Sequence, residues 1–133
     1  MRSWLFVPGD SERKLAKVDG CGADAVILDL EDSVAPQAKG AARERTAQFL
    51  EGADRPNLPS LWVRVNPYGS DFHDADVAAV VAARPDGIVL PKSHRAGLAA
   101  LDERLTALES ARGFEPESVR VLAIATETPA AVL

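Results

Sequence analysis

The stretch Ala25-Val26-Ile27-Leu28-Asp29-Leu30-Glu31-Asp32 decides the fold class of this chain. It opens with four apolar residues in a row, and three acids follow within four residues. A continuous apolar run, without polar residues at alternate positions, is typical of a strand buried on both faces of a parallel sheet. We therefore expect a buried strand over residues 25–30 that carries carboxylates at its carboxyl end.

Similar apolar runs recur along the chain. We expect strands at residues 3–7, 61–65, 87–90 and 119–125. The segments between the runs space their apolar residues as helices do, and we expect helices at residues 10–20 (with Asp10 as the cap), 36–50, 71–83 and 96–112. Strands that alternate with helices predict a parallel sheet with right-handed crossovers.

Two α/β architectures fit this alternation. A doubly wound sheet would be complete near 133 residues. A (β/α)₈ barrel needs about 250 residues, so the chain would supply its first half plus one strand. The pattern of strands and helices does not choose between them.

Composition and charge narrow the classes of partner. The hydrophobic fraction of 47% and the charged fraction of 26% are those of a soluble globular protein. A net charge of −5 without a basic block argues against nucleic acid and anionic membrane surfaces. The lone Cys21 excludes an internal disulfide and is expected to be a small buried residue. No signal peptide or membrane-length apolar run occurs, so we expect a cytoplasmic location by default.

Polar residues gather where the expected strands end. Both architectures place ligands at the carboxyl ends of the strands, which here carry Asp29, Glu31, Asp32, Arg64, Lys92 and Glu127. Ordinary loop acids and a rim lysine would account for several of these residues. Arg64 lies within an apolar run, so its guanidinium needs an anionic partner, either an acid of the preceding strand or a ligand. His73 and His94 are expected to be exposed residues at helix ends.

These residue types favour magnesium chemistry. Carboxylates with few histidines and no paired cysteines suit a hard cation such as Mg²⁺, for which Glu127 is the best single candidate ligand. Arg64 would hold a substrate carboxylate or stabilise charge that develops on an oxygen. A metal beside an arginine, around a substrate that carries a carboxylate, fits chemistry through an enolate.

Several motifs resemble one known group of proteins. They are residues 2–9 (RSWLFVPG), 24–36 (DAVILDLEDSVAP), Lys39 with Ala42-Arg43, 64–66 (RVN), 86–92 (DGIVLPK) and 126–129 (TETP). In this order they resemble the citrate lyase beta subunit-like group of the HpcH/HpaI aldolase superfamily, which also holds malyl-CoA and methylmalyl-CoA lyases. The resemblance covers the whole chain.

The resemblance implies a fold and an activity. It implies a phosphoenolpyruvate/pyruvate-type TIM barrel, of which residues 1–133 would be the N-terminal part of a single domain, and a homo-oligomer, often a trimer. It implies a Mg²⁺-dependent carbon–carbon lyase that cleaves a 3-hydroxyacyl-CoA of the citryl or malyl type. The products would be a keto acid and an acyl-CoA, formed through an enolate.

The resemblance also implies roles for single residues. Arg64 would bind the keto-acid or hydroxy-acid part of the substrate, and Glu127 would ligate Mg²⁺ at the substrate site. Phe6 and, in the first helix, Lys17 would help to position the CoA ester. The acids Asp29, Glu31 and Asp32 would orient Arg64 or metal-bound waters.

A second metal ligand is expected outside the chain. In the family it is an aspartate after the sixth strand, which would lie beyond Leu133, so we expect these residues to be an excerpt of a longer protein. An isolated half-barrel would expose an open sheet edge. Two alternatives to the lyase stay open: thioester hydrolysis on the same barrel, and a self-associating half-barrel without catalytic activity.

Overall fold

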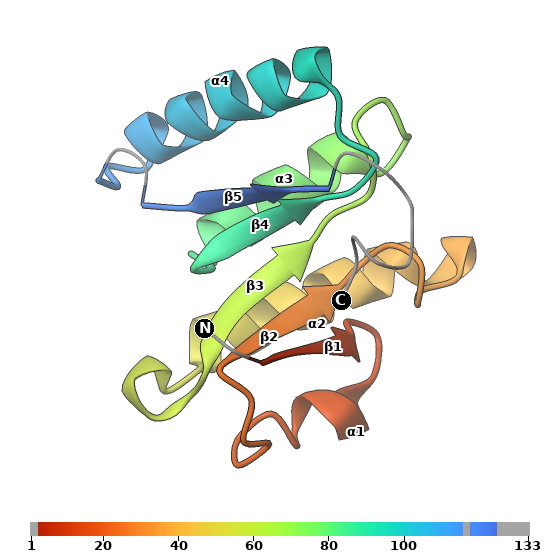
Figure 1. Ribbon diagram of the computed structural model, residues 1–133, viewed down its shortest axis with the longest axis vertical. Helices are drawn as coiled ribbons and strands as arrows, with labels where there is room; N and C mark the ends of the chain where they lie inside the picture. The colour runs from red at the N-terminus through yellow and green to blue at the C-terminus, as the bar shows by residue number, and fades with distance from the viewer. Residues whose placement is uncertain (1–2, 116–117, 125–133) are drawn as a thin grey trace.

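A computed structural model describes residues 3–115 and 118–124 as a parallel sheet covered by helices (Figure 1). The five strands follow one another across the sheet in chain order: β1 (Trp4–Pro8), β2 (Ala25–Asp29), β3 (Ser60–Arg64), β4 (Gly87–Leu90) and β5 (Arg120–Ala123). All four neighbouring pairs are parallel. The expected strands are therefore confirmed: β4 has the expected bounds, and the other four differ by one or two residues at their ends.

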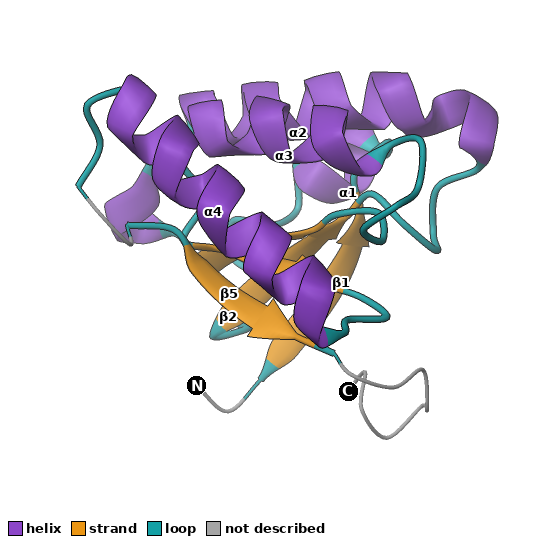
Figure 2. Cartoon of the chain, turned by 90° about the horizontal axis from the view of Figure 1, so that it is seen from above, coloured by secondary structure: helices purple, strands orange, loops and turns teal. Residues whose placement is uncertain are grey.

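Helices connect the strands. They are α1 (Glu12–Leu15), α2 (Lys39–Gly52), α3 (His73–Ala82) and α4 (Arg95–Ala111), with short 3-10 turns at Pro36–Ala38 and Arg55–Asn57. Figure 2 shows the helices together on one side of the sheet. Right-handed crossovers between successive strands place every helix on the same face, whereas a doubly wound sheet has helices on both. The fold is therefore the first part of a (β/α)₈ barrel, from β1 to β5.

Alternate residues of each strand face two different cores. One core packs between the sheet and the helices and includes Val26, Leu28, Leu61, Val63, Ile88 and Leu90. The other lies on the face without helices, the inner face of a barrel, and consists of Ala25, Ile27, Trp62, Val89 and Ile124, with Trp4 and Phe6 packed against it. Gly87 makes room for this inner core, because a Cβ there would overlap the indole ring of Trp62.

Helix α1 differs from the expectation. It ends at Leu15 rather than near residue 20, and the chain continues in turns up to Gly20 and Gly22, whose positive φ angles of 82° and 79° are incompatible with a helix. Its cap is Ser11 and not Asp10: the Ser11 hydroxyl accepts the backbone N–H of Lys14 at 3.2 Å. Lys17 therefore lies beyond the helix that was expected to carry it.

Two further expectations about single side chains were wrong. His73 is buried, at 2% exposure, because its Nδ1 bonds the backbone oxygen of Asn66 at 2.8 Å. Cys21 is only half-buried, because it lies in the turn after α1 and packs on the margin of the core. His94 is exposed as expected, and its ring caps the start of α4. Among the described residues, no helix is both long and apolar enough to cross a membrane.

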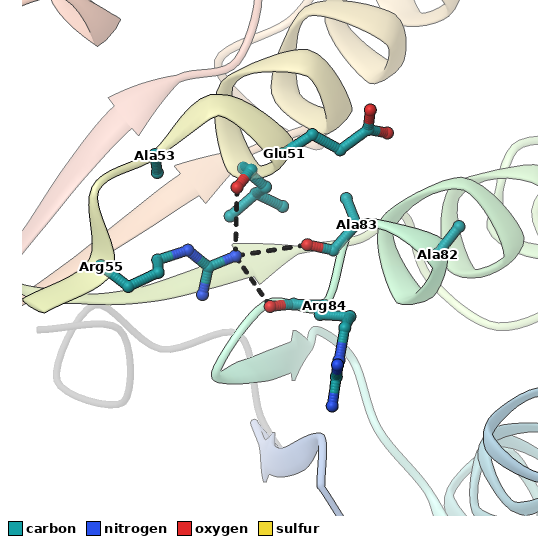
Figure 3. Close-up of a pocket in the computed structure, with 7 residues that line it drawn as sticks. Glu51, Ala53, Arg55, Ala82, Ala83 and Arg84 are labelled. Carbon is teal, nitrogen blue, oxygen red and sulfur yellow. Dashed lines mark hydrogen bonds between the residues drawn. The ribbon is translucent and has the colours of Figure 1, made fainter. Parts of the chain in front are cut away.

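The amino ends of the strands are closed by an arginine. Arg55 precedes β3, and one of its terminal nitrogens donates to the carbonyl oxygens of Leu50, Ala83 and Arg84 at 3.3, 3.2 and 2.8 Å (Figure 3). It thereby ties the carboxyl-terminal ends of α2 and α3 together. The adjoining hollow of about 430 Å³ lies at the edge of the sheet opposite to the one where barrel enzymes bind substrate.

Candidate functional site

The candidate site is centred on an ion pair between neighbouring strands. Asp29, the last residue of β2, is the register partner of Arg64, the last residue of β3, and both face the inner side of the sheet. Arg64 Nε donates to Asp29 Oδ1, and an Arg64 terminal nitrogen donates to Asp29 Oδ2, each at 2.8 Å. The residues are 1% and 5% exposed. The anionic partner that Arg64 requires is thus an acid of the preceding strand.

Asp29 is saturated with hydrogen bonds. Besides the two from Arg64, its oxygens accept the backbone N–H groups of Glu31 and Ser33, each at 2.9 Å. Burial opposes the charge on this carboxyl, but the donors from Arg64, Ser33 and Glu31 outweigh it and lower the pKa of Asp29. Asp29 is therefore an ionised anchor for Arg64.

Arg64 keeps part of its guanidinium available. Asp29 takes the side of the fork formed by Nε and one terminal nitrogen, and no described residue accepts from the other terminal nitrogen. Burial disfavours the charge, yet the bonds from Asp29 raise the pKa of Arg64, so the guanidinium stays protonated. The end of the fork is the edge that a planar carboxylate can bind through two hydrogen bonds.

Glu31 is a buried acid with an unsatisfied oxygen. It is 5% exposed, and its Oε1 has no hydrogen-bond partner among the described residues. Oε1 lies 3.7 Å from Arg64 Nε, and Oε2 lies 3.4 Å from Lys92 Nζ. Burial and the neighbouring Asp32 raise the pKa of Glu31. Asp32 itself is exposed, with Oδ2 4.0 Å from an Arg64 nitrogen.

Phe6 and Lys17 lie on the β1 side of the site. The Phe6 ring centroid is 4.7 Å from the Arg64 guanidinium carbon, a cation–π contact that joins β1 to the centre of the site. Phe6 and Lys17 also line the same groove of about 310 Å³, together with Lys14. The structure thus brings both residues to one groove, although only Phe6 contacts Arg64.

A second buried network lies behind the acids, and its role was not recognised in the sequence. Lys39 Nζ donates to the backbone oxygens of Leu30 and Glu31 and to Asn66 Oδ1, at 3.0, 2.9 and 2.7 Å. Asn66 Nδ2 in turn donates to Asp76 Oδ2 at 2.6 Å. Lys39 and Asn66 both belong to motifs that were noted in the sequence, Lys39 with Ala42-Arg43 and Asn66 in residues 64–66. No local sequence pattern indicates that Asp76 is their partner.

The carboxylate oxygens beside Arg64 are of the kind that bind a hard cation. Glu31 and Asp32 offer carboxylate oxygens, of which one is buried without a hydrogen bond, whereas all of Asp29's oxygens are already bonded. Within residues 3–115 and 118–124, no group of three or more acids, histidines or cysteines is arranged to hold a metal ion. Glu127, the candidate ligand, lies outside the described residues.

Comparisons with known proteins agree on one family. The sequence profile of the HpcH/HpaI aldolase/citrate lyase family matches residues 2–133. A (3S)-malyl-CoA thioesterase of Cereibacter sphaeroides is 43% identical over 95 residues, which are 71% of this chain and 33% of that protein. A citrate lyase subunit beta of Haemophilus influenzae is 36% identical over 129 residues, or 96% of this chain and 44% of that protein.

A solved structure shares the fold. The citrate lyase beta subunit of Mycobacterium tuberculosis, solved with oxaloacetate and magnesium, superposes with a TM-score of 0.62 at 28% identity. The match covers 90% of this chain and 56% of that one. The chain spans less than half the length of the two curated relatives above.

Proposed function

The chain belongs to the HpcH/HpaI aldolase/citrate lyase family, and from this premise we propose that the whole protein is a Mg²⁺-dependent carbon–carbon lyase. Its substrate would be a 3-hydroxyacyl-CoA of the citryl or malyl type, and its products a keto acid and an acyl-CoA. The observation that carries the proposal is the Asp29–Arg64 pair at the carboxyl edge of a barrel sheet, where one end of the buried guanidinium donates to none of the described residues.

Arg64 would bind the carboxylate of the keto-acid portion. Because Asp29 occupies the side of the guanidinium, the substrate would bind at its end, in a fixed orientation and with little loss of side-chain entropy. In the cleavage, the hydroxyl of the substrate loses its proton and becomes the carbonyl of the keto acid. The electron pair of the broken carbon–carbon bond passes to the thioester enolate, which is then protonated at carbon.

Glu127 would be the magnesium ligand of this chain. Glu31 and Asp32, whose oxygens lie 3.7 and 4.0 Å from Arg64 nitrogens, would orient Arg64 or metal-bound waters. Magnesium, when bound, supplies Lewis-acid stabilisation of the oxygen on which negative charge develops. The solved relative with oxaloacetate and magnesium supports both the ion and the class of keto acid. We also expect a homo-oligomer, a trimer by resemblance, with small-molecule partners and no nucleic acid or membrane partner.

Thioester hydrolysis is the second candidate, because the malyl-CoA thioesterase relative is 43% identical. The two reactions are told apart by their products. A lyase releases a keto acid with one molecule of acyl-CoA, whereas a hydrolase releases free CoA and a hydroxy acid. Malyl-CoA and citramalyl-CoA, each assayed for keto acid and for free thiol, therefore decide between them.

Substitutions in the full-length protein test the proposed roles. Arg64→Ala and Glu127→Ala should each lower kcat/KM by about 100- to 1000-fold, because each removes a group that stabilises charge. The control is Arg112→Ala, which deletes an exposed arginine after α4 and should leave kcat/KM unchanged. EDTA should abolish activity and added Mg²⁺ should restore it. Lyase activity close to that of the wild type in both site variants would refute the assignment.

A further inference from the structure

Lys39 is a buried cation for which the proposed reaction has no use. It is 7% exposed and is the first residue of α2, where the helix dipole disfavours a positive charge. Its three hydrogen-bond acceptors are two backbone carbonyls and one amide oxygen. No carboxylate of the described residues lies within ion-pair distance of its ammonium group. Burying a cation in this way costs free energy, so its retention calls for an explanation.

The groups that Lys39 holds are those that carry the acids of the site. The carbonyl groups of Leu30 and Glu31 lie on either side of the Glu31 Cα atom, which carries the Glu31 side chain. Asp32 is the next residue. The third acceptor, Asn66, lies two residues after Arg64. One ammonium group therefore links the loop after β2 to the end of β3, behind the acids and the arginine.

Lys39 also restricts the backbone that carries Glu31 and Asp32. Glu31 Oε1 has no hydrogen bond in the described part of the chain, Glu31 Oε2 lies 3.4 Å from the ammonium group of the exposed Lys92, and Asp32 is itself exposed. Their placement relative to Arg64, at 3.7 and 4.0 Å, therefore depends on the backbone that carries them. That backbone is held by Asp29 on the inner side and by Lys39 from behind.

We propose that Lys39 is a positioning residue, which fixes the loop after β2 so that Glu31 and Asp32 face Arg64 in the geometry that the reaction needs. The inference rests on the proposed function for its effect on catalysis. The structural part of the proposal, that Lys39 immobilises residues 30–33, does not depend on which reaction the protein catalyses.

A matched control is available at the opposite edge of the sheet. Arg55 is also a cation bonded to three oxygens, the carbonyls of Leu50, Ala83 and Arg84 (Figure 3). It lies at the amino ends of the strands, away from Arg64. Lys39→Met and Arg55→Met therefore delete comparable contacts, and only the first touches the loop after β2.

The test compares both variants in the full-length protein. Lys39→Met should speed hydrogen exchange at the Glu31 and Ser33 amides by about tenfold, because both amides donate to Asp29 in the held loop. It should also lower kcat by about 10- to 100-fold with a smaller change in KM. Arg55→Met should change neither quantity, although it too should lower the thermal midpoint.

Two results would overturn the proposal. One is unchanged exchange at Glu31 and Ser33 in Lys39→Met. The other is an equal loss of kcat in both variants, which would assign Lys39 to general stability alone. An inactive wild-type protein would instead refute the proposed function, and the exchange comparison would still decide whether Lys39 holds the loop.

Discussion

Replacing Asp29 by asparagine tests whether the ion pair is the anchor of Arg64. The variant keeps the shape of the side chain but leaves a guanidinium that is 5% exposed without its bidentate partner. Breaking a buried pair by removing one partner costs about 3–5 kcal/mol. Glu31, at 3.7 Å, compensates part of the charge, so we expect a loss in the unfolding free energy near the lower limit, about 3 kcal/mol.

The measurement is urea unfolding of wild type and Asp29→Asn, followed by circular dichroism, at pH 7 and at lower pH. Because the pKa of Asp29 is lowered from its ordinary value of 3.8, the pair contributes fully above that pH. Its contribution is lost as pH falls through the folded pKa, so the difference between the two proteins should shrink below pH 3.8.

The control is Asp32→Asn, which alters an exposed acid 4.0 Å from the same arginine. It should change the unfolding free energy by no more than about 0.5 kcal/mol. If Asp29→Asn were as mild as this control, the anchoring role of the pair would be wrong.

Two further predictions concern single contacts. Glu31→Gln should raise the unfolding free energy at pH 7 by on the order of 1 kcal/mol while lowering lyase activity, because the fold disfavours the Glu31 charge. Since the pKa of Glu31 is raised above 4.5, the advantage should vanish below that pH, which a pH series of urea unfolding measures. Gly87→Ala should cost about 1–3 kcal/mol because its Cβ meets Trp62, whereas Gly40→Ala, with open space around it, should gain about 0.5 kcal/mol; equal midpoints would contradict this.

The strands could be predicted because their physical cause is local. A run such as 25–30 is apolar at consecutive positions, and the prolines and glycines that follow several of the runs mark their ends. The choice of a barrel over a doubly wound sheet did not follow from this pattern. It depends on which face the helices cover, and that is a property of the whole chain (Figure 2).

The site was predictable only in part. Arg64 could be recognised because it is a charged residue within an apolar strand. The acids that follow residue 28 could be predicted as its ion-pair partners because they end the preceding strand. Lys39 contacts residues 8, 9 and 27 positions away, so nothing near it in sequence shows what it holds. The burial of His73 could not be predicted for a similar reason. The carbonyl group that its ring bonds belongs to Asn66, in the loop after β3 and seven residues away.

The pairing of Asp29 with Arg64 also protects the sheet against misassembly during folding. Side chains alternate between the two faces of a strand, so a slip of β3 by one residue would turn Arg64 towards the helices. There it would lose Asp29 and enter a core formed by apolar residues such as Leu28 and Val63. Burying an unpaired guanidinium among apolar side chains is far more costly than any hydrogen bond that such a slip could retain. The same two residues that build the site therefore penalise the wrong alignment of β2 and β3.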